Sequence, residues 1–528
     1  LSQKNSLHIK LRREGENMND EFNEELYGDE VEEEYMDALE ENAIAFSEAL
    51  PAIVREFQAS AVEVSHYNDI PAAISFFNIL GQITKDFIRI PNGRSIEDSR
   101  VHFCWVQTSG TGKSTLWNFV GPVANKTFEL INGKGQHPSL HTNSDNEYVD
   151  DIMKRTFDTF GVTDYTDSVL IGNWGEEKVM ETNPDTFEEK WTGEMKPKRN
   201  AGLLEGSGLA HWDEFEYSGI FKQSQHQDKA IVYLNTLMNT LAGESWIISK
   251  ALSSYDNKIM ECFCERSVIA MTYPPNNLNE VMAEKGVLQR MLLYVWEVPK
   301  FIQHKMRLEQ IDKAGTLEEV NQPVDRFANA LFKIYELVEE RFNEVGGNPL
   351  NVMTYSPDFN DVLKLEYQNM NNYLWNTRGE VAEIASNFTT RLLKILIKMS
   401  VLCSVASAPS IKDKSQRFNV SGHNVRQAAT IVRQCYMTLV DWLERSLRVK
   451  RHSIAENSLE SVFINVYKNM EKDEEGYVNK TLYFKAIKDK AKKSQAQIYR
   501  HFENVKHRFE EMYISRSKYI RLAKGDEE

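Results

Sequence analysis

The chain has 528 residues, of which 41% are hydrophobic, and its formal net charge is −16. This length and apolar content exclude a disordered protein and are sufficient for two to four domains with at least one large core. The negative total argues against a protein that coats nucleic acid with its whole surface. The two ends differ, however: residues 14–41 hold 14 acidic and no basic side chains, whereas residues 480–524 hold 13 basic and four acidic ones.

We expect the acidic segment to be solvated, and the basic segment, which is rich in Tyr and Phe, to be folded. No uninterrupted run of about 18 apolar residues and no secretory leader is found, so we expect a cytoplasmic protein without a membrane span. For a phage-encoded chain this is the cytoplasm of the bacterial host. Residues 12–16 imply purine-rich codons like a ribosome-binding site, so we expect translation to start at Met18. Five cysteines in apolar surroundings indicate reduced core residues: Cys104, Cys262, Cys264, Cys403 and Cys435.

Hydrophobic spacing predicts the order of helices and strands along the chain. Residues 42–88 have helical spacing that is interrupted at Pro51 and Pro71. Residues 99–298 alternate strand and helix signals, as expected of a parallel sheet with crossover helices. Helical spacing then continues over residues 324–449. The C-terminal region predicts three helices followed by two short strands.

The most specific motif lies in residues 101–115, which predict a buried strand, a glycine-containing loop and a helix. Gly110 and Gly112 allow backbone N–H groups to curl around phosphate oxygens, and the N-terminal end of the helix faces them. Lys113 is expected to reach the terminal phosphates and the Ser114 hydroxyl to bind Mg²⁺. The full pattern has Gly where this chain has Gln107, so the match depends on the remaining motif and its context. The predicted ATP contacts are Gly110, Thr111, Gly112, Lys113, Ser114 and Thr115.

An acidic pair about 100 residues after the loop is typical of the second element of such an ATPase. It ends the apolar strand that is predicted over residues 208–212. Asp213 is the expected acid on the Mg²⁺ side, and Glu214 is the expected base that orients the attacking water. A third apolar strand precedes three equal candidates for a polar sensor of the γ-phosphate: Thr272, Tyr273 and Asn276.

Two arginines are candidates for stabilising negative charge in the transition state. Arg290 leads into an apolar strand, a position from which an arginine can reach the ATP of a neighbouring subunit. Such contacts are worth about 10³ to 10⁵ in rate. Arg391, at the start of an apolar helix, is the second candidate. A surface ion pair is the alternative interpretation of each.

The order of these elements resembles a known family. A helical lead-in is followed by WVQTSGTGKST, LAHWDE, IAMTYP, GxxxRML and RLLK, an order that resembles the helicase-like ATPases of phage and plasmid replication, often fused to primases. More distantly, it resembles the minichromosome-maintenance helicases of the AAA+ class. The resemblance covers roughly residues 60–450. It implies ATPase roles for Lys113, Ser114, Asp213 and Glu214, a trans arginine finger at Arg290 and a second sensor at Arg391.

Two positions depart from the family pattern. Gln107 replaces the first loop glycine, and Tyr273 stands where the minichromosome-maintenance pattern has its sensor Asn. No primase-like metal cluster precedes the ATPase, so any primase is expected on a separate chain.

Two regions carry the residues that we expect to bind DNA. Residues 246–264 predict a hairpin with a polar tip, and in the resembled helicases a hairpin at this place projects into the central channel. Its tip would bind backbone phosphates and stack on bases, although an exposed hairpin without a ligand is the alternative. The C-terminal module predicts a winged helix-turn-helix, a fold that docks on duplex DNA or on proteins. The predicted DNA contacts are Lys250, Tyr255, Lys258, Lys492, Lys493 and Arg500.

These features together predict an α/β fold with a P-loop NTPase (AAA+-like) core that uses ATP and Mg²⁺. The predicted function is an ATP-driven DNA helicase or translocase of phage-type replication, acting as a homo-hexamer on single-stranded or forked DNA. Two alternatives stay open: a packaging or transposition ATPase that does not unwind DNA, and a replication initiator or regulator switched by ATP. The predicted parts are an acidic disordered segment (1–41), a helical lead-in (42–98), the ATPase core (99–300), a helical lid or collar (301–450) and the winged helix (458–524).

Overall fold

The computed structural model forms two compact units, residues 1–442 and 443–528. The boundary falls within helix α14 (Gly422–Asn457). The structure describes residues 29–134, 157–162, 170–182, 189–213, 215, 230–249, 259–274, 286–312, 321–375, 380–457, 459–473, 476–491, 498–499, 502, 506, 509–514 and 517–522.

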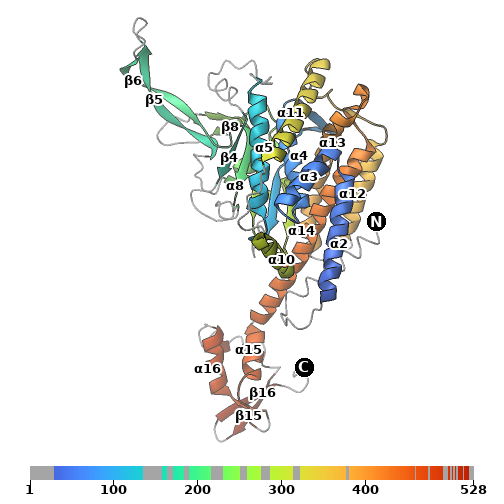
Figure 1. Cartoon of the computed structure of the whole chain (residues 1–528). Coiled ribbons are helices and arrows are strands. Elements are labelled where there is room, and N and C mark those ends of the chain that lie inside the picture. Colours follow the sequence, from blue (N-terminus) through green and yellow to red (C-terminus); the bar gives the residue numbers. More distant parts are fainter. Residues whose placement is uncertain are drawn as a thin grey trace. The chain divides into compact units, whose positions relative to one another are not determined.

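A five-stranded parallel sheet lies at the centre of the first unit (Figure 1). Its spatial order is β11-β3-β10-β7-β4, so β10 separates the strand before the glycine loop from the strand before Asp213. Parallel pairing requires crossover connections, and the predicted parallel sheet is therefore confirmed. The strands are β3 (Phe103–Gln107), β4 (Asp158–Val162), β7 (Gly206–Trp212), β10 (Cys264–Thr272) and β11 (Leu292–Trp296).

One aromatic cluster joins the helices that lie beside this sheet. The centroid of the Phe57 ring lies 5.3 Å from that of Phe76, 5.2 Å from that of Phe119 and 5.1 Å from that of Phe327. All four rings are buried, and such contacts between large rings stabilise a core strongly. The predicted lead-in, ATPase core and collar therefore share one core within a single compact unit. The helices that carry the cluster are α3 (Ala52–Val64), α4 (Asp69–Thr84), α5 (Lys113–Asn132) and α11 (Asn321–Glu344).

The N-terminal part differs from the prediction in three places. Helix α2 (Asp29–Ala49) begins within the segment that we expected to be disordered, because Glu favours helices and acidic residues near a helix N-terminus interact favourably with its dipole. Pro71 does not break α4, since it lies in the first turn, where no N–H donor is needed. The lead-in ends in a hairpin of β1 (Arg89–Asn92) and β2 (Ser95–Asp98) rather than in helix, with Gly93 at φ 63° in its two-residue turn.

Two further antiparallel strand pairs occur in the chain segments that connect strands of the central sheet. The pair β5 (Gly172–Thr182) and β6 (Glu189–Ala201) projects from the unit and was not predicted from the sequence (Figure 1). The pair β8 (Trp246–Ser249) and β9 (Ile259–Cys262) confirms the two strands of the predicted hairpin.

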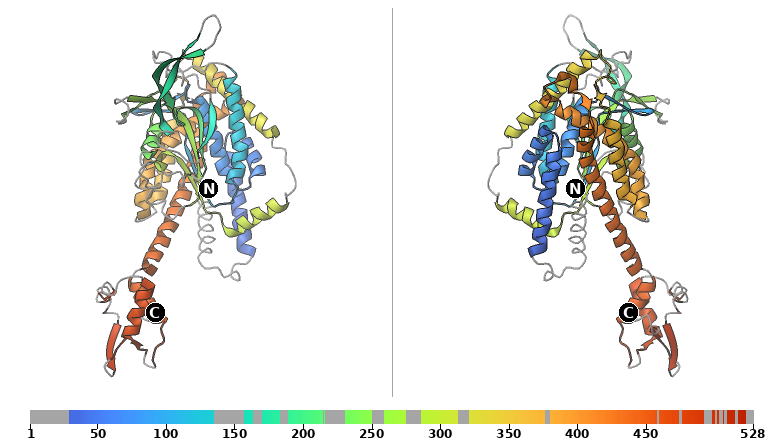
Figure 2. Two further views of the ribbon diagram at one scale, coloured as in Figure 1. Left: turned by 90° about the vertical axis from the view of Figure 1, so that its left-hand side faces the viewer. Right: turned by 90° about the vertical axis from the view of Figure 1, so that its right-hand side faces the viewer.

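From residue 324 the first unit is mainly helical, as predicted. After α11 come α12 (Phe359–Trp375), α13 (Glu380–Ser407), the short helices η3 (Ala408–Ser410) and η4 (Lys414–Gln416), and the parallel pair of β12 (Thr354–Tyr355) and β13 (Asn419–Val420). Earlier in the chain lie α8 (Ala230–Asn239), the short helix η2 (Leu288–Arg290) and α10 (Lys300–Asp312). The segment Ile384–Ser410 is long and apolar enough to cross a membrane, but 78% of its most apolar window is buried inside the protein. This burial is that of a core helix. Figure 2 shows the α13 and α14 region from two further sides.

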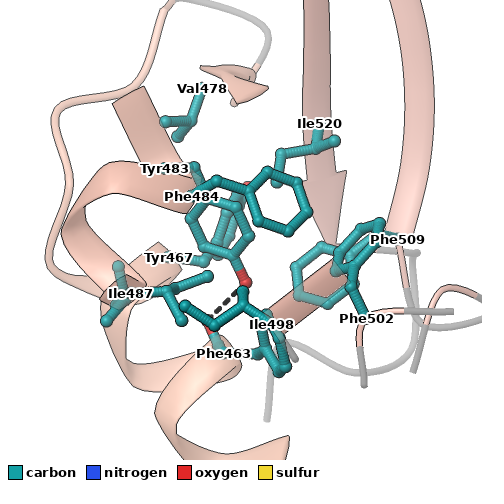
Figure 3. Close-up of a cluster of buried hydrophobic side chains, with 11 residues drawn as sticks. Phe463, Tyr467, Val478, Tyr483, Phe484, Ile487, Ile498, Phe502, Phe509 and Ile520 are labelled. Atoms are coloured by element: carbon teal, nitrogen blue, oxygen red, sulfur yellow. Dashed lines mark hydrogen bonds between the residues drawn. The ribbon is translucent and has the colours of Figure 1, made fainter. Parts of the chain in front are cut away.

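The second unit packs around its own aromatic core (Figure 3). A three-stranded antiparallel sheet in the order β14-β16-β15 supports α15 and α16. The buried Tyr483 donates a hydrogen bond from its hydroxyl to the Phe463 carbonyl oxygen at 2.7 Å, and Phe502 and Phe509 pack 5.6 Å apart. The elements are α15 (Leu459–Lys468), β14 (Val478–Asn479), α16 (Lys480–Ala491), β15 (Phe509–Ile514) and β16 (Ser517–Leu522).

Candidate nucleotide site

A glycine-containing loop, residues 108–112, joins the end of β3 to the start of α5. Gly110 and Gly112 have φ angles of 71° and 89°, a backbone region that side chains disfavour. A Cβ atom at position 112 would lie 2.4 Å from the Ser65 hydroxyl oxygen, so glycine is also required by space. The first N–H groups of α5 have no partner within the helix and point towards this loop. The sequence thus builds a turn that presents N–H groups at a positive helix end.

Lys113 begins α5 and is buried, and its side chain lies against the loop. The ammonium group donates to the Gln107 carbonyl oxygen at 2.7 Å and to the Thr108 carbonyl oxygen at 3.2 Å. It also lies 4.5 Å from the centroid of the Tyr273 ring, a cation–π arrangement. Ser114 and Thr115 follow in the first turn and are exposed.

Gln107, which departs from the phosphate-loop pattern, is fully buried and holds the loop. Its amide nitrogen donates to the Asn68 side-chain oxygen at 2.9 Å and to the Thr111 hydroxyl at 2.8 Å. Its amide oxygen accepts from the Trp105 ring nitrogen at 2.6 Å. A glycine at position 107 would remove the hydrogen bonds of Gln107 to Asn68, Thr111 and Trp105. This is a physical reason why the chain departs from the phosphate-loop pattern here.

The turn between α3 and α4 contacts the same loop from the other side. Asn68 donates to the Thr111 carbonyl oxygen at 3.0 Å, and Ser65 donates to the Gly112 carbonyl oxygen at 2.9 Å. Asn68 also donates to the Ser65 hydroxyl oxygen at 2.7 Å. We call Ser65, Asn68, Gln107 and Thr111 the loop clamp. Sequence reasoning missed it, because polar residues far apart in the chain carry no local signal of their contact.

The candidates from the other strands lie at the same carboxyl edge of the sheet. In the register, Trp212 is opposite Ala270, and Asp213 follows directly, exposed. Thr272 ends β10 opposite Val106 and is buried, and Tyr273 follows it beneath Lys113. Glu214 and Asn276 lie outside the described residues. The structure thus brings Lys113, Asp213, Thr272 and Tyr273 to one edge, as parallel strands require.

A ring stack between β7 and α5 lies next to this edge. The His211 ring, next to Asp213 on β7, stacks on the Trp117 ring of α5 with centroids 3.8 Å apart and planes 5° apart. Burial lowers the pKa of His211 to about 4, and the Asp213 charge only partly opposes this effect. His211 is therefore neutral near pH 7 and fixes α5 against the acid-bearing strand.

Arg290 and Arg391 lie at the opposite, amino edge of the sheet. β11 begins just after Arg290, with Leu292 opposite Phe103 at the start of β3. β11 ends with Trp296 opposite Gln107, where the loop begins. The four residue steps from Phe103 to Gln107, of about 3.3 Å each, separate the two edges of the sheet by roughly 13 Å. The two candidates are therefore together, but far from the loop of their own chain.

The arginines share one basic pocket. Burial and then the Arg391 charge lower the pKa of the Arg290 guanidinium, so the two charges are close. Arg290 donates to the Asn239 side-chain oxygen at 3.1 Å and to the Gly286 carbonyl oxygen at 2.6 Å. Among the described residues, neither arginine has a carboxylate partner. The pocket is lined by Glu97, Arg100, Val101, His102, Met238, Asn239, Arg290, Arg391, Lys394, Ile395 and Lys398.

The other cations of this pocket are paired. Lys394 and Lys398 form ion pairs with Glu97, and Arg100 pairs with Asp98 at 2.7 Å. Arg290 and Arg391 thus differ from their neighbours, which makes a surface ion pair the weaker interpretation within the described part of the chain.

The side chains that we predict to bind DNA fall in two segments of the chain. Lys250, Tyr255 and Lys258 come between β8 and β9 in the sequence and lie outside the described residues. The same holds for Lys492, Lys493 and Arg500 in the second unit. Within the described residues no three His, Cys, Asp or Glu side chains gather as a metal-binding group.

Comparison with known proteins adds no assignment. No family model matches the chain, and no curated protein matches it.

Proposed function

We propose that this protein is an ATP-driven DNA motor, a helicase or translocase, whose copies complete each other's nucleotide sites. ATP binds the glycine loop of one copy, and Arg290 and Arg391 of the next copy approach its γ-phosphate. The sheet order, with β10 between the loop strand and the acid-bearing strand, supports the AAA+-like core that the sequence resemblance implies.

One observation carries the trans arrangement. Two adjacent arginines without described carboxylate partners lie at the amino edge, roughly 13 Å of strand from their own loop. Two like charges are costly to hold close together, unless an anion neutralises them. A phosphate from a second copy is such an anion, and it would supply the stabilisation of the transition state that an arginine finger gives.

The residues at the carboxyl edge fit Mg²⁺ and ATP. The exposed Ser114 hydroxyl and Asp213 carboxylate offer the oxygen ligands that Mg²⁺ prefers, while phosphates and water complete its shell. Bound there, Mg²⁺ neutralises phosphate charge. Lys113 would exchange its loop carbonyls for phosphate oxygens, and Glu214 would orient the attacking water. One of the three sensor candidates, Thr272, Tyr273 or Asn276, would contact the γ-phosphate.

Two regions support action on DNA. The β8–β9 hairpin leads directly into β10, whose other end carries Thr272, so hairpin and nucleotide edge are joined by one strand. The second unit has the element order α15, β14, α16, then β15 and β16 in a three-stranded sheet, which supports a winged helix-turn-helix. The proposal places single-stranded DNA at the hairpin and duplex DNA at the second unit.

The decisive test is complementation between two inactive variants. Lys113→Ala lacks a working loop, and Arg290→Ala lacks the arginine, so each protein alone should have little ATPase activity. Mixed oligomers contain interfaces with an intact Lys113 on one side and an intact Arg290 on the other, and activity should return. Mass photometry with ATP and single-stranded DNA reports whether hexamers form, and co-purification of differently tagged variants reports whether they are mixed. Mixed oligomers without recovered activity would rule out the trans site.

The motor and its alternatives differ in other readouts. A helicase separates a forked duplex, whereas a packaging or transposition motor hydrolyses ATP without strand separation. An ATP-switched initiator turns over slowly and is not stimulated by DNA. Glu214→Gln should bind ATP normally but hydrolyse it poorly, and unchanged turnover would remove Glu214 from the role of base.

A further inference from the structure

Arg290 is held by the end of helix α8. Its Nε donates to the side-chain oxygen of Asn239, the last residue of α8, and its Nη1 donates to the Gly286 carbonyl oxygen. These two bonds fix one side of the guanidinium group. The planar fork of arginine leaves its remaining N–H groups directed elsewhere, where they can meet an anion.

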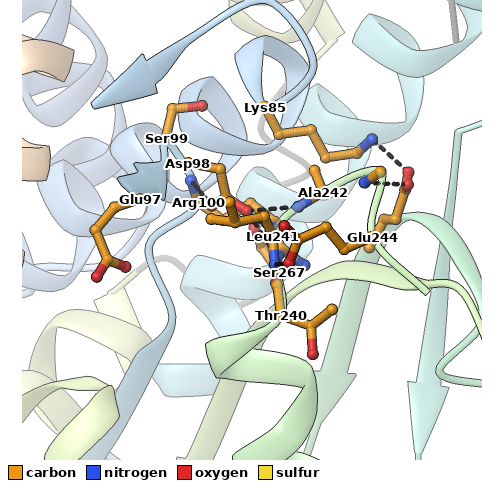
Figure 4. Close-up of polar contacts among 12 residues, drawn as sticks. Lys85, Glu97, Asp98, Ser99, Arg100, Thr240, Leu241, Ala242, Glu244 and Ser267 are labelled. Atoms are coloured by element: carbon orange, nitrogen blue, oxygen red, sulfur yellow. Dashed lines mark hydrogen bonds and ion pairs between the residues drawn. The ribbon is translucent and has the colours of Figure 1, made fainter. Parts of the chain in front are cut away.

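The four residues after Asn239 form a turn whose backbone is bound by buried charges (Figure 4). Arg100 donates to the Thr240 carbonyl oxygen, and the Asp98 carboxylate accepts from Ala242 N–H at 2.9 Å. The Glu265 carboxylate accepts from Gly243 N–H at 2.8 Å, and Arg89 donates to the Ala242 carbonyl oxygen. We call residues 240–243 the charged turn.

The charges around this turn are fixed by further pairs. Lys85 donates to Glu265 at 2.6 Å and forms an ion pair with Asp86. Burial disfavours the charge of Lys85, but Asp86 and Glu265 outweigh it and raise the pKa of the amine. Burial likewise favours the neutral form of Asp98, yet Arg100 and Lys398 lower its pKa. Such paired and hydrogen-bonded groups make a stiff connection, since breaking one contact leaves a buried charge.

The charged turn leads to the predicted DNA hairpin. Trp246 begins β8 three residues after Gly243, and its ring lies 5.4 Å from the Tyr233 ring of α8. Glu265, which holds the turn, belongs to β10 directly after β9. Both strands of the β8–β9 hairpin are therefore anchored to the segment that Arg290 contacts.

We propose that Asn239 is a positioning residue for Arg290, and that the charged turn couples a neighbouring copy's nucleotide to the β8–β9 hairpin. This inference rests on the proposed function. When Arg290 engages or releases the γ-phosphate, its bond to Asn239 shifts the end of α8. A stiff turn cannot absorb that shift, so it reaches β8 as a change in the position or stability of the hairpin.

The test compares three variants of the full chain. Asn239→Ala removes the acceptor of Arg290, Asn239→Ser keeps a shorter one, and Asn329→Ala removes an exposed Asn that bonds only within its own helix. We expect Asn239→Ala to lower kcat for ATP about tenfold at unchanged KM, because the loop that binds ATP is intact. Asn239→Ser should recover part of this loss, and Asn329→Ala should match the wild type.

Hydrogen exchange gives a readout that does not depend on turnover. A non-hydrolysable ATP analogue should change the exchange of residues 246–249 and 259–262 in wild-type oligomers, and Asn239→Ala should remove most of that change. Wild-type kcat and exchange in Asn239→Ala would overturn the inference, as would an active wild type in which bound analogue leaves the hairpin unchanged. A wild type that never hydrolyses ATP would instead refute the proposed function.

Discussion

The two edges of the central sheet carry the two halves of the proposed nucleotide site, and they are built differently. At the carboxyl edge, Gly110, Gly112 and Lys113 are consecutive parts of one loop and helix start. At the amino edge, Arg290 and Arg391 come from separate segments, a short helix and the long helix α13. In the proposed site, phosphate would therefore be bound by a local motif, whereas the charge that would meet the phosphate of another copy has to be assembled by the fold.

The largest expected effect separates binding from hydrolysis at the carboxyl edge. Lys113→Ala should lower ATP hydrolysis at least 100-fold and weaken ATP binding, because the phosphates lose the charge that faces them. Phosphate release and titration with a fluorescent ATP analogue measure the two effects. Lys126→Ala, further along the same helix and exposed, is the matched control. Full ATPase activity in Lys113→Ala would remove the loop from the site.

At the amino edge, Arg391→Ala should leave ATP binding intact and lower kcat by roughly 10- to 1,000-fold. This loss of kcat should be no larger than the loss in Arg290→Ala. The reason is that Arg391 would act on nucleotide bound by another copy. Arg326→Ala, which removes an exposed arginine paired with Glu56, should behave as the wild type. Weakened ATP binding by monomeric Arg391→Ala would place this arginine at its own loop and contradict the division between the edges.

The loop clamp should contribute stability to the carboxyl edge. Gln107→Ala leaves the buried side-chain oxygen of Asn68 and the ring nitrogen of Trp105 without the partner that Gln107 provides, which costs roughly 2 to 4 kcal/mol of unfolding free energy. Chemical denaturation measures this loss, and the KM for ATP should rise in parallel. Gln303→Ala, which removes one bond on the surface of α10, should cost far less. Equal losses of unfolding free energy in Gln107→Ala and Gln303→Ala would show that the loop clamp contributes no more stability than a single hydrogen bond elsewhere.

The last prediction concerns the pH dependence of stability. His211 has a folded-state pKa of about 4, below its unfolded value near 6.5, so the unfolded chain binds the extra proton. The stabilisation is complete above pH 6.5 and is lost as pH falls towards 4, up to roughly 3 kcal/mol. His211→Phe keeps a ring against Trp117 but does not titrate, so its unfolding free energy should fall less steeply over that range. Identical slopes would contradict the assigned shift.

Sequence alone predicted the elements whose signals are local. The strand, loop and helix around Lys113, the parallel sheet and the strands of the β8–β9 hairpin follow from spacing and turn residues. The β1–β2 hairpin also had a local signal in Asn92 and Gly93, which we read as part of a helical region. The loop clamp and the meeting of Arg290 with Arg391 could not be predicted, because they depend on how distant segments pack.

The start of α2 and the β5–β6 hairpin were also not predicted from the sequence. Acidic composition predicted disorder up to residue 41, but α2 begins at Asp29, since charge density alone does not oppose a helix of good helix formers. The β5–β6 hairpin was missed because both strands are rich in charged residues and lack the apolar alternation that marks a half-buried strand.

The loop clamp also determines where the protein can be cut. A fragment that starts at β3 would keep every residue of the phosphate-binding motif. It would, however, lose Ser65 and Asn68, which hold the carbonyl groups of Gly112 and Thr111. Phe119 and Phe327 would also lose their shared aromatic partner Phe57, which belongs to the discarded helix α3. Helices α3 and α4 are therefore an inseparable part of the folding unit, and a minimal ATPase fragment has to begin before them.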